Sequence, residues 1–293
     1  MQKPGLLTLK LLIMFPSMKI TCIGTSLLFL TLSSSAQLGG LGKGKINAKA
    51  IGAAQNGAKA LTFTNADAIK LSKEGVVWMD AHNPVAAATD PYAIRLEKIF
   101  GKHKNEDGLE LNYKVYKVKD INAFACADGS VRVFSSQMDI LTDDEILAVV
   151  GHEIGHVKNE DTKDAVKSAY MRAAVTDAAA SQSGAVRQLS DGELGVFAEN
   201  FLGAKHSRRQ ESEADTYSYN FLKKHQYNVV GAFTAFKKLA LLSAGAEPSK
   251  SEKMMSSHPD SEARAGEVKK HAEKDGLWKD PGEVVLPKVK LKS

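Results

Sequence analysis

The chain has 293 residues, of which 43% are hydrophobic and 25% are charged. This length and composition allow one substantial hydrophobic core or two small ones, and they exclude a wholly disordered chain. The formal net charge of +5 at pH 7 is too small for the basic signature of a nucleic-acid-binding protein.

The amino terminus has the pattern of a secretory signal peptide. Residues 20–32 form a mostly apolar run, which Met18 and Lys19 precede and small residues follow. The run is shorter than the stretch of about 20 apolar residues that a membrane span needs. We therefore expect a signal peptide over residues 1–36, cleaved after Ala36, with retention as a membrane anchor as the alternative. The true start of the chain could also be Met18.

Cleavage would leave a mature chain with little net charge and one cysteine. It would remove three lysines and no acidic residue, so the net charge would fall from +5 to +2. Cys22 lies at the beginning of the apolar run, whereas a lipid-modified cysteine should follow such a run, so we do not expect lipidation. Only Cys126 would remain, and the exported protein would be stabilised by packing and not by a disulfide.

The mature chain is predicted to be α+β and mostly helical, with a single domain over residues 47–278. A flexible leader rich in Gly and Lys precedes it at 37–46, and a basic tail at 279–293 is interpreted as a solvated end. Residues 112–137 predict a small sheet with an Asp-Gly turn, and the polar segment 101–108 predicts a turn. Apolar periodicity and capping residues predict helices at about 47–60, 64–82, 91–100, 143–157, 161–181, 191–224 with a break near Gly203, 228–243 and 260–274.

The helix that begins after Thr142 carries the clearest chemical signal. Thr142 and Glu145 form a capping box, and His152 and His156, four residues apart, lie on one face of the helix. Both can bind one zinc ion, which lowers the pKa of a bound water to about 7. Glu153 is placed to take a proton from that water. The alternative, two exposed histidines on a surface helix, is disfavoured because this helix has the apolar pattern of a buried one.

The two histidines need a third ligand from elsewhere in the chain. A third histidine six residues further on is excluded because that position is Thr162. The stretch SRRQESEADTYSYNF at 207–221 offers Glu211 and Asp215, which share a helix face, and Glu213, which points elsewhere. Glu211 or Asp215 can bind zinc while the other accepts the free N–H of a ligand histidine. Without the zinc-binding helix, this stretch would be interpreted as a solvated charged face.

Three motifs in chain order, GHEIGH, ESEAD and SHPDSEAR, resemble those of the HtpX-like and CAAX-protease-like zinc metallopeptidases, the forty-eighth metallopeptidase family. The segment from NYKVYKVKD to GHEIGHV resembles the small periplasmic LoiP-type branch of that family. The resemblance implies a zincin-like fold with a small β-sheet beside the H-E-x-x-H helix. It also implies residue roles: His152, His156 and Glu211 as zinc ligands, Glu153 as general base, and Asp215 as the carboxylate that orients a ligand histidine.

This chain departs from the branch in two respects. Members of the LoiP-type branch are lipoproteins, whereas no cysteine here is placed for lipid attachment. Asp161 stands where many relatives carry an extra histidine, which is not a zinc ligand in the family.

His258 lies in the third motif, six residues before Arg264. A lone histidine is usually structural or at the surface. The resemblance makes it an equal alternative that His258 reaches the site, where it would stabilise the oxyanion or act as a fourth ligand in a latent form. Arg264 is expected to hold that segment through a carboxylate. The other five histidines lack partners at ligand spacing and are interpreted as ordinary: His82, His103, His206, His225 and His271.

A protease holds its substrate in an extended conformation, and an edge strand with free backbone groups can pair with it. Residues 131–136 are the predicted edge strand, and a plain structural hairpin is the alternative.

Taken together, the sequence predicts an exported zinc endopeptidase with one zinc ion per chain. Its substrates would be polypeptides, in particular misfolded or damaged envelope proteins, in the periplasm or associated with the envelope. Nucleic acid is not an expected partner, and membrane association is not required. The main alternative is a non-catalytic zinc-bound chaperone or assembly factor on the same fold. The intact Glu153 argues against it because a pure binder has no need of a general base.

Overall fold

The computed structural model describes residues 63–174, 186, 188–244 and 257–288. The expected signal peptide, the leader and the helix predicted at 47–60 lie outside these residues. Within the described part of the chain, no helix combines the length and the apolar character needed to cross a bilayer.

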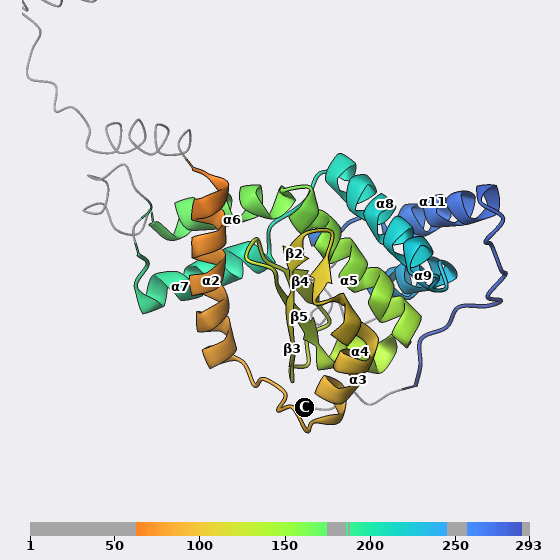
Figure 1. The fold of residues 1–293 in the computed structure, drawn as a ribbon, viewed down its shortest axis with the longest axis horizontal. Helices are drawn as coiled ribbons and strands as arrows, with labels where there is room; N and C mark the ends of the chain where they lie inside the picture. The colour runs from red at the N-terminus through yellow and green to blue at the C-terminus, as the bar shows by residue number, and fades with distance from the viewer. Residues whose placement is uncertain (1–62, 175–185, 187, 245–256, 289–293) are drawn as a thin grey trace, which may run out of the picture. The chain divides into compact units, whose positions relative to one another are not determined.

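A mixed three-stranded sheet lies at the centre of the described domain (Figure 1). Its strands are β3 (Asn112–Tyr116), β5 (Ser130–Phe134) and β4 (Ala123–Ala125), in that spatial order. Strand β5 runs parallel to β3 and antiparallel to β4, to which a turn through Asp128 and Gly129 connects it. Gly129 has a φ of +83°, a conformation that glycine adopts without steric cost.

This topology confirms the predicted sheet but not the predicted edge strand. Residues 131–134 pair with β3 on one side and with β4 on the other, so β5 is the central strand of the sheet. The prediction that residues 131–136 form an edge is therefore wrong. The edge strand beside the helix that carries His152 is β4.

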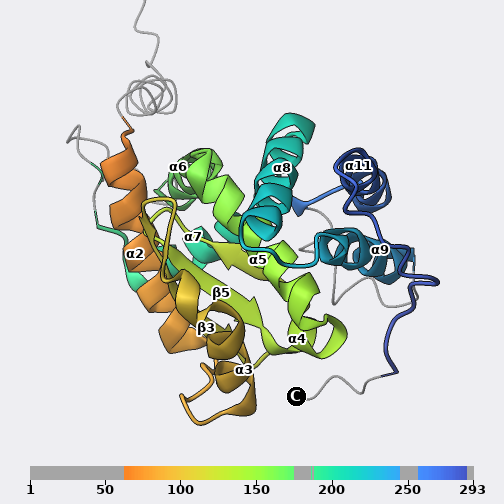
Figure 2. The ribbon, with the colours of Figure 1, turned by 45° about the vertical axis from the view of Figure 1, so that its right-hand side comes forward.

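Helices cover both faces of the sheet, as Figures 1 and 2 show. On one face, Tyr116, Phe124 and Phe134 pack against three helices: α2 (Asn65–His82), α6 (Asp161–Ala174) and α7 (Asp191–Leu202). On the other face, Val131 and Val133 join the larger core, to which six described helices contribute: α3 (Pro91–Phe100), α4 (Ser135–Ile140), α5 (Asp143–Lys158), α8 (Arg208–Lys224), α9 (Val230–Ala244) and α11 (Ser261–Lys274). Successive side chains of a strand point to opposite faces of the sheet, so the side chains of β5 are shared between two cores.

A buried ion pair fixes α2 to the sheet. Arg132, on the central strand, is only 1% exposed, and its Nε and Nη2 donate to the two carboxylate oxygens of Asp80 on α2 at 2.8 and 2.9 Å. Burial acts to raise the pKa of Asp80, but hydrogen bonds from Arg132, Lys114 and Tyr116 outweigh it and hold this pKa at about 2. Asp80 is therefore ionised at neutral pH and balances the buried guanidinium.

The predicted helices are found with few changes of boundary. The long helix predicted at 191–224 breaks at Gly203 into α7 and α8, as expected, and residues beyond 174 of the helix predicted at 161–181 lie largely outside the described residues. The sequence did not predict α4 (Ser135–Ile140). The predicted turn at 101–108 instead holds a short 3-10 helix, Gly101–His103, and the beginning of a small hairpin, β1 (Asn105–Glu106) and β2 (Leu109–Glu110).

Candidate metal centre

Helix α5 carries His152 and His156 into the core, and two of its glycines allow helix α8 to pack closely against it. The capping box forms as predicted: the Thr142 hydroxyl accepts from the Glu145 amide. A Cβ at Gly155 would lie 3.0 Å from Ala214 Cα on α8, and one at Gly151 would lie 3.2 Å from the ring of Phe221. These glycines let α8 pack closely against α5, which places the first turn of α8 beside the histidines.

Four side chains from three parts of the chain converge at this point. His152 and His156 come from α5, Glu211 from α8, and His258 from the segment before α11, and each residue is no more than 7% exposed. One ligand atom from each lies within 4.8 Å of those of the other three. The structure therefore brings the three predicted ligands together with His258, for which the sequence left open a role as oxyanion stabiliser or as fourth ligand.

The spacing of these atoms suits a tetrahedral metal ion. His152 Nε2 lies 3.1 Å from His156 Nε2 and 3.2 Å from His258 Nδ1. Glu211 Oε1 lies 3.4 Å from His156 Nε2 and 3.0 Å from His258 Nδ1. Four ligands at 2.0–2.1 Å from a tetrahedral zinc ion would be about 3.4 Å apart. Imidazole nitrogens and a carboxylate are also the donor set of catalytic zinc sites.

An aspartate carboxylate lies beside the Nδ1 atom of each histidine, on the side of the ring away from the cluster. His152 Nδ1 lies 2.8 Å from Asp215 Oδ1, and His156 Nδ1 lies 3.0 Å from Asp161 Oδ2. A carboxylate on the second ring nitrogen fixes the tautomer and the orientation of a ligand histidine. Asp215 is thus where the sequence predicted it. Asp161, noted only as a departure from the family, supports His156.

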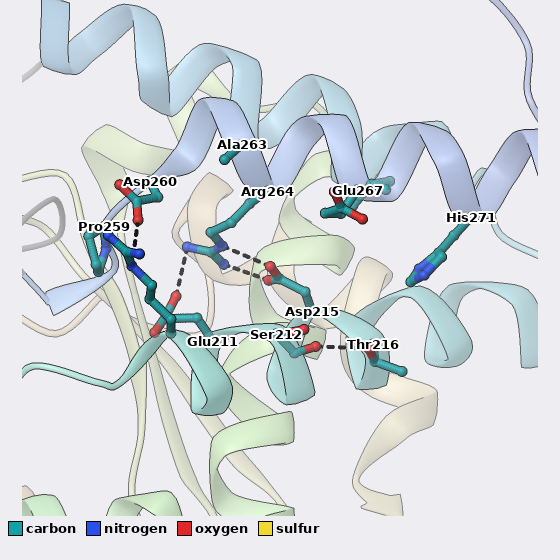
Figure 3. Close-up of a pocket in the computed structure, with 12 residues that line it drawn as sticks. Glu211, Ser212, Asp215, Thr216, Pro259, Asp260, Ala263, Arg264, Glu267 and His271 are labelled. Carbon is teal, nitrogen blue, oxygen red and sulfur yellow. Dashed lines mark hydrogen bonds and ion pairs between the residues drawn. The ribbon is translucent and has the colours of Figure 1, made fainter.

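Arg264 ties the carboxylates of α8 together, as Figure 3 shows. Its Nε and Nη2 donate to the two oxygens of Asp215 at 2.8 and 2.6 Å, and its Nη1 lies 2.8 Å from Glu211 Oε2. Burial raises the pKa of Asp215, but these bonds more than offset it and hold the value at about 2. Arg264 thus links the segment before α11 to two carboxylates of α8. Behind it, a cavity of about 250 Å³ opens between α8 and α11.

Glu153 stands beside the cluster without binding to it. The residue is 5% exposed, and its Oε1 has no hydrogen-bond partner among the described residues. That oxygen lies 3.6 Å from His258 Nε2. Burial raises the pKa of the Glu153 carboxyl above its usual range, which brings a carboxylate closer to the pKa that suits a general base near neutral pH.

Strand β4, His206 and Ser257 line a small cavity beside the four converging side chains. A cavity of about 30 Å³ is lined by residues of β4 together with Glu153, His156 and His206. The ring of His206 stacks on that of His156 with centroids 3.8 Å apart, and the backbone N–H of His206 donates to the carbonyl of Ser257. Such a cavity has room for water but not for a peptide residue.

His206, interpreted from the sequence as an ordinary histidine, lies beside a predicted ligand. Its ring covers a predicted ligand, although it lies 50 residues further along the chain, because the loop after Gly203 turns back over α5. The sequence signal that could have placed His206 near the site was its position just before Ser207, the N-cap residue of α8.

Comparison with known proteins assigns the chain to a family. The profile of Peptidase family M48 matches residues 96–272. Metalloprotease YcaL of Escherichia coli (strain K12) is 40% identical over 221 residues, which are 75% of this chain and 85% of that protein. Metalloprotease LoiP of the same organism is 40% identical over 220 residues, which are 75% of this chain and 86% of that protein. The resemblance drawn from the three motifs is thus confirmed, and the chain belongs to peptidase family M48, the zinc metalloproteases.

Proposed function

We propose that this chain is a zinc-dependent endopeptidase whose single catalytic zinc is held by His152, His156 and Glu211. The observation that carries the proposal is the buried convergence of these three side chains at the spacing of zinc ligands. Asp215 and Asp161 orient the histidines, and Arg264 holds Glu211 and Asp215 in place. A protease acts on polypeptides, and we propose unfolded or damaged proteins as the substrates.

In this proposal the zinc ion supplies Lewis acidity, which polarises a carbonyl and lowers the pKa of a water molecule. The chain's own groups do the rest. Glu153, buried and free of hydrogen bonds at Oε1, takes the proton of the attacking water and passes it to the leaving amine. Strand β4, the edge strand that lines the cavity, pairs with the extended substrate in place of the predicted 131–136 segment.

We propose that the described conformation is a closed one, in which His258 is a fourth ligand. Its Nδ1 lies among the ligand atoms, 3.2 Å from His152 Nε2, and the cavity beside it is too small for a peptide. Opening would carry His258 away from the ligand position. An N–H of its imidazole would then be available to donate a hydrogen bond to the oxyanion.

Metal analysis of the purified protein, paired with a cleavage assay, tests the proposed activity. We expect zinc in protein purified without a chelator, cleavage of a labelled unfolded protein, loss of cleavage after chelation, and its return when zinc is added back. Protein that contains no metal and takes none up on titration would rule out the enzyme.

We also propose that the chain is exported, by cleavage of the signal peptide after Ala36, to the periplasm or the envelope. The apolar run at 20–32 and the small residues after it support this proposal. The mature protein should begin at Gln37, and the intact mass of the exported protein measures this. A mass that retains residues 18–36, or a lipid on Cys22, would contradict cleavage at this site.

A further inference from the structure

A second group of metal-ligating side chains lies at the other end of α8. His103 and Glu106 come from the 3-10 helix and strand β1, and His225 is the residue that caps the C-terminus of α8. One ligand atom from each lies within 4.8 Å of those of the other two. His103 and Glu106 are 2% and 3% exposed. His103 and His225 have no partner at ligand spacing in the sequence, whereas the structure places both beside Glu106.

Glu106 is the centre of this group. Its Oε2 lies 3.1 Å from His103 Nδ1, and its Oε1 lies 3.0 Å from His225 Nε2. The two imidazole rings are themselves close, with centroids 4.5 Å apart and nearly perpendicular. Two imidazoles and one carboxylate are a donor set that binds zinc in proteins, and these spacings approach the distance of about 3.4 Å between ligands on one zinc ion.

The surroundings orient these groups as those of a metal site do. His103 Nε2 lies 2.7 Å from the hydroxyl of Tyr227. This hydrogen bond fixes the orientation of the ring, so that Nδ1 faces the Glu106 carboxylate. The side chain of His225 is 25% exposed, so a fourth position on that side can be filled by water.

Lys224 is a positive group that opposes a cation here. Its Nζ donates to Glu106 Oε1 at 2.7 Å and also to Asp107 Oδ1 at 2.8 Å. Its side chain is 52% exposed. Lys224 can therefore leave Glu106 and keep its partner Asp107, which would free the carboxylate for a metal ion.

We propose that His103, Glu106 and His225 form a second, structural zinc site. A zinc ion there would replace the two hydrogen bonds between Glu106 and the histidines. Each neutral imidazole would then keep its one proton on the ring nitrogen that does not face the metal. The zinc ion would join the β1–β2 hairpin to the C-terminus of α8, the helix whose first turn carries Glu211. The sequence predicted one zinc ion per chain, at His152, His156 and Glu211, and this second site would add another.

The test is the zinc stoichiometry of the full-length protein after removal of metal by chelation and stepwise titration with zinc. We expect two zinc ions per chain in the parent protein, one in His225→Ala and one in Glu106→Gln. His152→Ala should also retain one, at the second site, so the failure of either site can be told from the failure of the other. The matched control is His271→Ala, at an exposed histidine, which should bind two.

A second measurement is the thermal midpoint Tm of each metal-loaded variant. Zinc should raise the Tm of His152→Ala, which keeps only the second site, because a ligand that binds the native state stabilises it. A parent protein that binds a single zinc ion, or a His225→Ala variant that still binds two, would overturn the proposal. Because His225 is partly exposed, this variant decides the question even if Glu106→Gln fails to fold.

Discussion

Replacing Glu153 by glutamine is expected to lower the rate of peptide hydrolysis by about 10²–10⁴-fold, the loss that follows removal of a positioned general base. Glutamine has nearly the same shape but cannot take a proton. Zinc content should stay at the parent level, because Glu153 is not among the converging ligand atoms. The fold should also persist, because the Glu153 carboxylate has an oxygen without a hydrogen-bond partner among the described residues.

The comparison requires zinc content, thermal unfolding and cleavage of a labelled unfolded protein for the parent, Glu153→Gln and Glu213→Gln. Glu213 is a matched control because it is exposed and, among the described residues, pairs with Arg209 on its own helix. A Glu153→Gln protein that cleaves like the parent would place the activity elsewhere, or in a contaminant. A parent that holds zinc and suppresses aggregation, but cleaves nothing, would favour the chaperone alternative.

Local features of the sequence predicted the parts of the site that depend on one helix. His152 and His156 share a face because an α-helix has 3.6 residues per turn, and the capping box at Thr142 fixed where that helix begins. The break at Gly203 and the starts of α3 and α11 were likewise visible in single residues. Such signals need no knowledge of the rest of the fold.

The choice between Glu211 and Asp215 needed more than local sequence. Both lie on one face of α8, and spacing alone left either as a ligand. The structure places Glu211 at the cluster and Asp215 behind His152 because α8 crosses α5 at Gly151 and Gly155. The family resemblance gave the same order.

The errors concern contacts between distant segments. The position of β5 at the centre of the sheet follows from its pairing with both β3 and β4, which no local alternation reveals. His206 reaches His156 through a loop, and His103 meets His225 across more than 100 residues. A histidine without neighbours in sequence therefore says little about its neighbours in space.

Replacing Glu211 by glutamine is expected to weaken zinc binding itself, and hydrolysis should fall with it. Glu211 supplies the only carboxylate of the catalytic cluster, and its hydrogen bonds with His156 and His258 hold its pKa far below the usual range although burial opposes them. Glu211 is therefore ionised, and glutamine would remove the charge of this proposed ligand. The loss of zinc affinity should exceed the about 10–100-fold expected for Asp215→Asn, which removes only a partner of His152.

Competition with a zinc-binding dye measures these affinities, with Glu213→Gln as the control. Excess zinc should restore cleavage to Asp215→Asn and to Glu211→Gln in part, but not to Glu153→Gln, because only the first two lose metal. Loss of zinc from Glu213→Gln while Glu211→Gln keeps it would mean that the third ligand is misassigned. Equal losses for Glu211→Gln and Asp215→Asn would mean that both carboxylates act through Arg264, which each of them contacts, and not through the metal.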